Sequence, residues 1–133
     1  MSTQSSSDSA LHTWLRRLAE GILALVMVAV GWSHGVLYVE GGSMQPALYP
    51  GDLIVYRRIG HEPVRGDLVV FRHDGTLVVH RVMRVRADDS LVMRGDANAD
   101  DDPSPVDGDS VRGTVIAVVP IGRAAERLVS RSE

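Results

Sequence analysis

The sequence predicts a mainly β fold, in which one small β domain is carried on a single N-terminal transmembrane helix. Apolar residues form one long run at positions 21–39, and beyond it they recur at every second position. An almost wholly apolar run of this length, although weakened here by Ser33 and His34, is typical of a membrane-spanning helix, whereas period-two alternation is typical of half-buried strands. With 133 residues, the chain has room for one such domain besides the helix.

Composition excludes several classes of function. The formal net charge of −3 provides no basic surface, which argues against nucleic acid as a partner. The chain has no cysteine, so it offers no disulfide, no thiol nucleophile and no cysteine-based metal site. All 14 basic residues are arginines, and lysine is therefore not available as a catalytic base.

The apolar run predicts a retained membrane anchor at residues 18–39, preceded by a disordered cytoplasmic tail at residues 1–17. At about 1.5 Å per residue, a helix of this length just crosses a hydrocarbon core of roughly 30 Å. Arg16 and Arg17 precede the run and Glu40 follows it, so the positive-inside rule places the N-terminus in the cytoplasm and the domain outside the cell membrane. A cleaved signal peptide and a buried core helix are the alternatives, but the run is long for the former and lacks a polar face for the latter.

The period-two segments predict the strands of a domain that covers residues 40–122. They are rich in β-branched residues, are separated by turn signals, and lie at residues 53–57, 68–72, 77–85, 91–94 and 111–119. Between the second and third of them, His73-Asp74-Gly75-Thr76 predicts a tight hairpin, because Asp-Gly accepts the positive φ angles of a type I′ turn. Residues 123–133 are expected to form a short polar tail, which favours a short helix and is too charged for a second membrane span.

A glycine-rich stretch between the anchor and the first strand presents a serine. Residues 41–52 read GGSMQPALYPGD, and the two glycines free the backbone immediately before Ser43. Pro46 and the Pro50-Gly51-Asp52 corner stiffen the segment and turn the chain into the first strand. A serine held in this way close to a membrane is interpreted as a nucleophile. A simple Gly/Ser linker between anchor and domain is the alternative.

A serine nucleophile needs a base, and without lysine the candidates are the five histidines. One of them, His80, lies within a predicted strand, where alternation places it on one face with Val78 and Val82. Such an apolar surround disfavours the charged imidazolium, so this imidazole is expected to be neutral and able to accept a proton. A core histidine that is satisfied by a backbone carbonyl is the alternative. The other histidines lie before or within the anchor or in polar turns; they are His12, His34, His61 and His73.

The carboxylate that would orient this histidine lies among the aspartates of residues 94–103. Asp96 follows a glycine, as in the other Gly-Asp turns of the chain, and its alternative role is that of a turn residue. Residues 100–102 are three aspartates in a row, which also suit a solvated acidic loop. A calcium loop is a further alternative, although the stretch lacks the ligand spacing and the terminal glutamate of an EF-hand.

Together these segments resemble a type I signal peptidase, and more closely the Ser–His branch of the S26 serine peptidase family known from the endoplasmic reticulum, archaea and some Gram-positive bacteria. The resemblance covers roughly residues 39–122. It is carried, in the order of the family, by the serine box at residues 42–52, RGDLVVF at residues 65–71, VHRV at residues 79–82, RGDAN with the following Asp-Pro at residues 94–103, and VRG at residues 111–113. Histidine stands in VHRV where the Ser–Lys enzymes of bacteria carry lysine.

The resemblance implies a membrane-bound serine endopeptidase that removes signal peptides at small-x-small sites. Ser43 would attack the scissile carbonyl, and His80 would take its proton and pass it to the leaving amine. Asp102 resembles the carboxylate that assists the histidine, and Asp96 resembles the other important aspartate of the family; either fits the orienting role. The implied partners are exported preproteins with signal peptides and the lipid bilayer, and the chemistry requires no metal or organic cofactor.

The chain departs from the Ser–Lys relatives at Gly41, where they often carry a second serine as an oxyanion donor. The oxyanion would then depend on backbone N–H groups, including that of Ser43, and on a further donor that the sequence does not identify. Two alternative functions fit the same residues: a dedicated maturation protease for one or a few exported proteins, and a catalytically silent, membrane-tethered β module that binds them.

Overall fold

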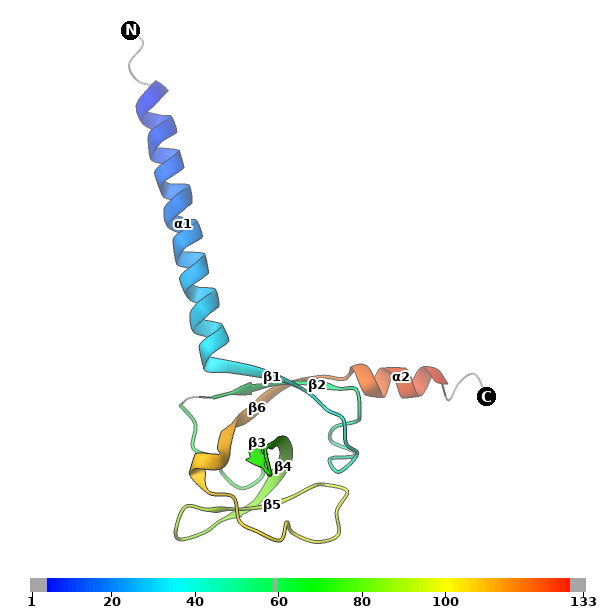
Figure 1. The fold of residues 1–133 in the computed structure, drawn as a ribbon. Coiled ribbons are helices and arrows are strands. Elements are labelled where there is room, and N and C mark those ends of the chain that lie inside the picture. The colour runs from blue at the N-terminus through cyan, green and yellow to red at the C-terminus, as the bar shows by residue number, and fades with distance from the viewer. Residues whose placement is uncertain (1–4, 59, 130–133) are drawn as a thin grey trace. The chain divides into compact units, whose positions relative to one another are not determined.

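The chain divides into an N-terminal helical unit that ends at Ser33 and a β unit that begins at His34. The computed structural model describes residues 5–58 and 60–129. Figure 1 shows the elements along the chain. They are α1 (Ser5–Ser33), β1 (His34–Tyr38), β2 (Leu53–Arg57), β3 (Leu68–His73), β4 (Thr76–Val85), β5 (Leu91–Arg94), the 3₁₀ turn η1 (Gly108–Ser110), β6 (Val111–Val119) and α2 (Ile121–Val129).

Helix α1 contains most of the predicted anchor and extends to its N-terminal side. Residues 5–17, which were expected to be disordered, are helical, because alanine, leucine and arginine are good helix formers and a nucleated helix propagates easily. Apolar side chains of its second half are exposed, among them Leu25 and Val28. Among the residues that the structure describes, no helix combines the length and the apolar content needed to cross a membrane. Residues 1–4 of the predicted tail lie outside the described residues.

The first strand occupies a stretch that the sequence assigns to the anchor. Helix α1 ends at Ser33, so the predicted range 18–39 is helical only up to this residue, and β1 pairs antiparallel with β2. Gly35 is required at this pairing, since a Cβ there would overlap the Tyr56 ring. The valine, leucine and tyrosine of β1 suit a strand as well as an apolar helix, and pairing with β2 decides between the two.

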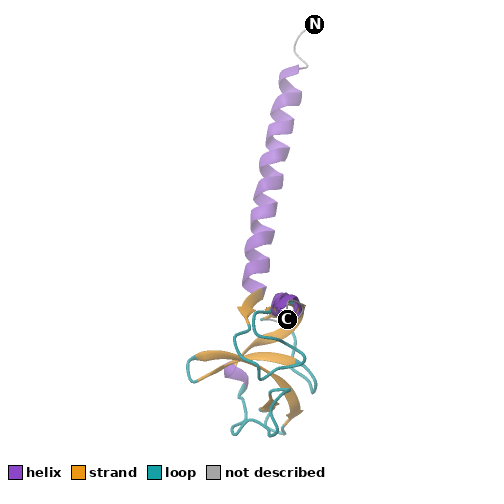
Figure 2. Ribbon diagram, turned by 90° about the vertical axis from the view of Figure 1, so that its right-hand side faces the viewer, coloured by secondary structure: helices purple, strands orange, loops and turns teal. Residues whose placement is uncertain are grey.

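The β unit is built on one antiparallel sheet of six strands in the order β1-β2-β6-β3-β4-β5. The sheet contains the five predicted strands, which confirms a mainly β domain, and the bounds of β3 and β4 differ from the predicted ones by one residue each. The last strand, β6, lies between β2 and β3 and pairs with both. In Figure 2 the described part of the β unit consists of strands and loops, with helix confined to η1 and α2.

The hairpin between β3 and β4 has the predicted geometry. Asp74 and Gly75 adopt φ angles of 48° and 82°, both positive as a type I′ turn requires. From this turn the register runs back to the pair formed by Val69 and His80. The turn therefore fixes where His80 lies along the sheet.

Two clusters of buried side chains form the core. The first includes Met44 and Leu48, which follow Ser43 in the chain and are 1% and 0% exposed. Burial of such side chains contributes about 1.5–3 kcal/mol each to stability. This packing therefore holds residues 41–52, the serine segment, against the sheet. The second cluster lies mainly on β3, β4 and β5 and consists of Val69, Phe71, Val82, Leu91, Met93 and Val106.

Helix α2 begins within two residues of the end of β6. The polar tail predicted at residues 123–133 is helical up to Val129, and residues 130–133 lie outside the described residues. Apolar residues recur in α2 at helical spacing, so that they share one face of the helix while the charged side chains share the other. Ile121 and Leu128 on the apolar face are exposed.

Candidate active site

Ser43 lies in a tight turn that links β1 to β2. The N–H of Gln45 donates to the carbonyl oxygen of Gly42 over 3.1 Å, and the N–H of Leu48 donates to that of Met44 over 2.9 Å. With Met44 and Leu48 buried below it, the turn leaves Ser43 half-buried at the surface. The Gly-Gly-Ser sequence thus presents a hydroxyl on a turn whose underside is held by buried side chains. This is the kind of presentation that the sequence predicts for a nucleophile.

A second loop packs closely against this turn. The N–H of Ala97 donates to the carbonyl oxygen of Ser43 over 2.8 Å. Gly95 lies so near that a Cβ on it would come within 2.6 Å of the same oxygen and 3.0 Å of Ser43 Cβ. A side chain at position 95 would therefore push the serine out of place.

His80 reaches Ser43 from the centre of β4. The imidazole Nε2 lies 3.2 Å from Ser43 Oγ, within hydrogen-bonding distance. His80 is only 9% exposed, and the Phe71 ring meets it edge-on with 6.0 Å between centroids. The apolar surround that strand alternation predicts is therefore present, with Phe71 as a member that the alternation of β4 alone does not identify.

Asp102 lies on the other side of the imidazole. Its Oδ2 is 2.6 Å from His80 Nδ1, and its own N–H donates over 2.8 Å to the carbonyl oxygen of Met93 on β5. The side chains of Asp102 and His80 are 17% and 11% exposed. Serine hydroxyl, imidazole and carboxylate thus form one line of hydrogen bonds, shielded from most of the solvent.

Asp96 bonds to a different partner. Arg81 donates from Nε to Asp96 Oδ1 over 2.8 Å and from Nη2 to Oδ2 over 2.6 Å, which is a bidentate pair. A third bond runs from Arg81 Nη1 to the carbonyl oxygen of Gly66 over 2.8 Å. The hydrogen bond to Asp96 raises the pKa of Arg81 above its ordinary value, against the opposing effect of burial. The two aspartates that the sequence leaves equivalent are therefore separated: Asp102 contacts the histidine, and Asp96 contacts the neighbouring arginine.

The remaining candidates that follow have other partners. His61 pairs with Asp67 over 2.9 Å and His73 with Asp74 over 3.6 Å, both at exposed turns. Asp101 forms a long surface ion pair of 3.8 Å with Arg94. Within residues 5–58 and 60–129, no group of three or more histidine, aspartate or glutamate side chains is placed to hold a metal ion. The predicted calcium alternative therefore gains no ligand set here.

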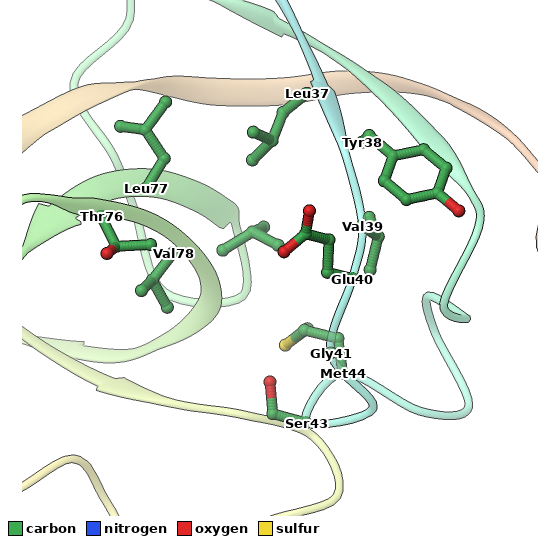
Figure 3. Close-up of a pocket in the computed structure, with 11 residues that line it drawn as sticks. Leu37, Tyr38, Val39, Glu40, Gly41, Ser43, Met44, Thr76, Leu77 and Val78 are labelled. Atoms are coloured by element: carbon green, nitrogen blue, oxygen red, sulfur yellow. The ribbon is translucent and has the colours of Figure 1, made fainter.

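A groove of about 560 Å³ opens beside Ser43. One wall is the segment from Leu37 to Gly41, and the other is the start of β4 at Thr76 to Val79. Figure 3 shows the Ser43 hydroxyl and the Glu40 carboxylate on the side of this groove, among mostly apolar side chains. The groove thus lies between two strand-like segments, with Ser43 among its lining residues.

A comparison with known protein families identifies the family of this chain. Residues 21–119 match the family described as Peptidase S24-like. The chain belongs to the Peptidase S24-like family. The matched range contains Ser43, His80, Asp96 and Asp102, whereas helix α2 lies beyond it.

A separate comparison with individual proteins finds relatives that are catalytic subunits of the signal peptidase complex. SEC11C of Homo sapiens is 34% identical over 102 residues, which cover 71% of this chain and 48% of the relative. SEC11 of Yarrowia lipolytica is 44% identical over 75 residues, covering 52% and 43%, and SEC11 of Candida albicans is 38% identical over 78 residues, covering 54% and 47%. The chain spans about half the length of the curated relatives it matches. The similarity to signal peptidases that the sequence motifs indicate is confirmed.

Sequence reasoning missed two features of this Peptidase S24-like site. The first is the wall made by β1, which was assigned to the anchor. The second is the Arg81–Asp96 pair, although its signal was present: on a strand, residue 81 points away from the face that carries His80. An arginine beside the histidine and an aspartate beside Gly95 were both visible, but their pairing depends on the fold.

Proposed function

We propose that this Peptidase S24-like chain is a membrane-bound serine endopeptidase that removes signal peptides from exported preproteins at small-x-small sites. The observation that carries the proposal is the position of His80 between Ser43 Oγ at 3.2 Å and Asp102 Oδ2 at 2.6 Å. A base in contact with a hydroxyl, and itself oriented by a carboxylate, is the arrangement that activates a serine.

The geometry suggests a role for each group in the reaction. Ser43 Oγ attacks the scissile carbonyl carbon while His80 Nε2 accepts the hydroxyl proton. Asp102 accepts a hydrogen bond from Nδ1–H, which keeps the proton-accepting lone pair on Nε2 and stabilises the imidazolium that forms. The imidazolium then gives its proton to the leaving amine. A water activated by the same imidazole hydrolyses the acyl-enzyme and restores Ser43.

Backbone donors are assigned to the oxyanion. Position 41 is glycine and carries no hydroxyl, so we assign the N–H of Ser43 as one donor. Its direction is set by the turn that Gly42, Gln45 and the buried Met44 stabilise. Because such donors are fixed before the substrate arrives, they need little reorganisation during the reaction.

The groove supports an extended substrate with apolar side chains next to the cut. Its walls are two strand-like segments, and an extended peptide between them would form main-chain hydrogen bonds on either side. Leu37, Val39, Leu77 and Val79 line it and favour apolar contacts. Similarity to signal peptidase catalytic subunits supports the same class of substrate.

We further propose that α1 is a retained anchor, with the N-terminus in the cytoplasm and the β unit outside. Residues 18–33 rise about 24 Å at 1.5 Å per residue, which is less than a hydrocarbon core of roughly 30 Å. A short span is accommodated by local thinning and by flanking side chains that reach the interface, and Arg17 and Trp32 stand at its two ends. Exposed apolar residues on the β unit, including Val36, Tyr38 and Leu128, support contact with lipid.

Cleavage of a preprotein with an Ala-x-Ala site tests the proposal. The full chain in detergent is compared with Ser43→Ala and His80→Ala, and wild type alone should cut. A fluorophosphonate probe that labels Ser43 without cleavage of general preproteins would indicate a dedicated maturation protease. Failure of wild type both to cleave and to label would overturn the enzyme proposal in favour of a silent binding module.

Extraction of membranes with alkaline carbonate tests the anchor separately. A retained span keeps the chain in the membrane pellet, whereas a peripheral protein is released. Release of the full chain would overturn the anchor and leave the chemistry of the β unit unaffected.

A further inference from the structure

Helix α2 is attached by its first turn to the segment that follows Ser43. Asp52, which ends this segment, is fully buried. Its Oδ1 accepts hydrogen bonds from the N–H groups of Gly122 and Arg123 over 3.0 and 3.3 Å, and its Oδ2 accepts one from the N–H of Tyr49 over 2.9 Å. One carboxylate thus joins the start of α2 to a turn of the serine segment.

The side chain of Arg123 makes a second attachment nearer to the serine. Its Nη2 donates to the carbonyl oxygens of Pro46 and Ala47 over 2.7 and 3.1 Å. The guanidinium also lies over the Tyr49 ring, 4.6 Å from its centroid, which is a favourable cation–π distance. Both carbonyls belong to residues three and four positions after Ser43.

The backbones approach so closely that only glycine fits between them. A Cβ on Gly122 would overlap the carbonyl oxygen of Pro50. Gly51, which has a φ of 93°, in turn faces the backbone of Gly122. This fit holds residues 50–52 against the first turn of α2, whereas residues 46 and 47 are contacted by the Arg123 side chain.

The opposite end of the serine segment is held from another side. The N–H of Ala97 fixes the Ser43 carbonyl oxygen, and the hydrogen bond from the Leu48 N–H to the Met44 carbonyl oxygen closes the turn that contains Pro46 and Ala47. Loss of Arg123 would therefore free one side of a short turn while the other side stays bound. A displacement of the nucleophile by about 1 Å can cost roughly 10²-fold in rate.

We propose that Arg123 is a positioning residue, which holds the serine segment from α2 and so keeps Ser43 Oγ in hydrogen-bonding distance of His80. The inference rests on the proposed function of Ser43 as a nucleophile. It extends the active machinery to a helix that lies outside the Peptidase S24-like match.

The test compares Arg123→Ala with the matched variant Arg112→Ala. Arg112 also donates from its guanidinium to two backbone carbonyls, those of Asp109 and Val111, but at the η1 turn. Both variants therefore lose the same kind of bond. We expect Arg123→Ala to lower kcat about ten- to a hundredfold with little change in KM, and Arg112→Ala to leave kcat unchanged. Arg123→Lys should recover part of the loss, because one ammonium can reach a carbonyl but lacks the planar fork.

Amide hydrogen exchange of residues 43–48 provides a readout that does not depend on cleavage. Protection of these amides should fall in Arg123→Ala and stay unchanged in Arg112→Ala. Equal kcat in the two variants, or equal protection, would overturn the positioning role. If wild type itself fails to cleave, the proposed function fails, and the exchange experiment still decides whether Arg123 holds the segment.

Discussion

His80 and Arg81 are neighbours on β4, and each forms a hydrogen bond of 2.6 Å with an aspartate of the loop after β5. The partner of His80 is Asp102 and that of Arg81 is Asp96, yet the surroundings of the two residues differ. His80 faces inward, 9% exposed, beside Phe71 and in line with Ser43. Arg81 faces the other way and is one-third exposed in its side chain. The comparison teaches that strand alternation can direct one of two adjacent residues toward the candidate nucleophile and the other toward the attachment of a loop.

The outward pair, Arg81 and Asp96, still affects the inward pair, His80 and Asp102. Asp96 lies between Gly95 and Ala97, which both touch Ser43. When Arg81 holds Asp96, it also holds the loop against the serine turn. We therefore expect changes to the inward pair to affect the chemical step, and changes to the outward pair to affect stability first and activity only through loop position.

The largest difference in kcat between the two pairs should come from truncating the basic residue of each pair, His80 or Arg81, to alanine. His80→Ala removes the proposed base, and kcat on a preprotein should fall by about 10⁴- to 10⁶-fold while the fold is kept. Arg81→Ala should lower the unfolding temperature and reduce kcat far less. Thermal unfolding followed by circular dichroism, beside single-turnover cleavage, measures both. Equal losses of kcat would contradict the division of roles.

The next largest effect is expected at the inward carboxylate. Asp102→Asn keeps the size of the side chain but favours the wrong imidazole tautomer, and kcat should fall by about 10³- to 10⁴-fold. The free energy of unfolding should change by less than about 1 kcal/mol, since one hydrogen bond is exchanged for another. A variant with normal kcat would remove Asp102 from the mechanism.

A pH profile sharpens the comparison with a smaller effect. A protonated imidazole cannot accept the Ser43 proton, so kcat/KM should fall toward acid pH if a histidine is the base. Arg81 does not contribute to this limb, because its pKa is raised above its ordinary value by the hydrogen bond to Asp96 and it stays charged throughout. A profile that stays flat through the acid range would exclude His80 as the base.

The smallest effect is expected at the outward carboxylate. Asp96→Asn replaces a charged, bidentate partner with a neutral one, and the free energy of unfolding should fall by about 1–2 kcal/mol. We expect kcat to fall no more than about tenfold, through loosening of the loop beneath Ser43. Urea unfolding measures the first quantity and steady-state kinetics the second. A loss of kcat as large as that of Asp102→Asn would show that the two aspartates are not distinct.

The parts of this fold that local pattern determines were predictable. Alternation located five strands, and Asp74-Gly75 specified the hairpin turn. The boundary between helix and β1 was not predictable, because valine, leucine and tyrosine suit both an apolar helix and a strand, and the choice depends on pairing with β2.

The site was predictable in residue type more than in contacts. Ser43 and His80 follow from a presented hydroxyl and a histidine on an apolar strand face. Whether Asp96 or Asp102 meets the histidine depends on the path of a loop, which neither spacing nor composition specifies. The attachment of Arg123 to the serine segment joins residues more than 70 positions apart and leaves no local signal.

The position of β6 has a consequence for how this protein is made. Val111–Val119 is the last strand within the described residues, yet it lies between β2, which follows the serine turn, and β3, which leads into the histidine strand. During synthesis the two halves are hydrogen-bonded into one sheet only after the ribosome has released this strand. A stalled nascent chain that ends before Val111 should therefore remain unreactive toward a serine-directed probe. Reactivity of Ser43 would then depend on β6 as much as on the strands that carry the site.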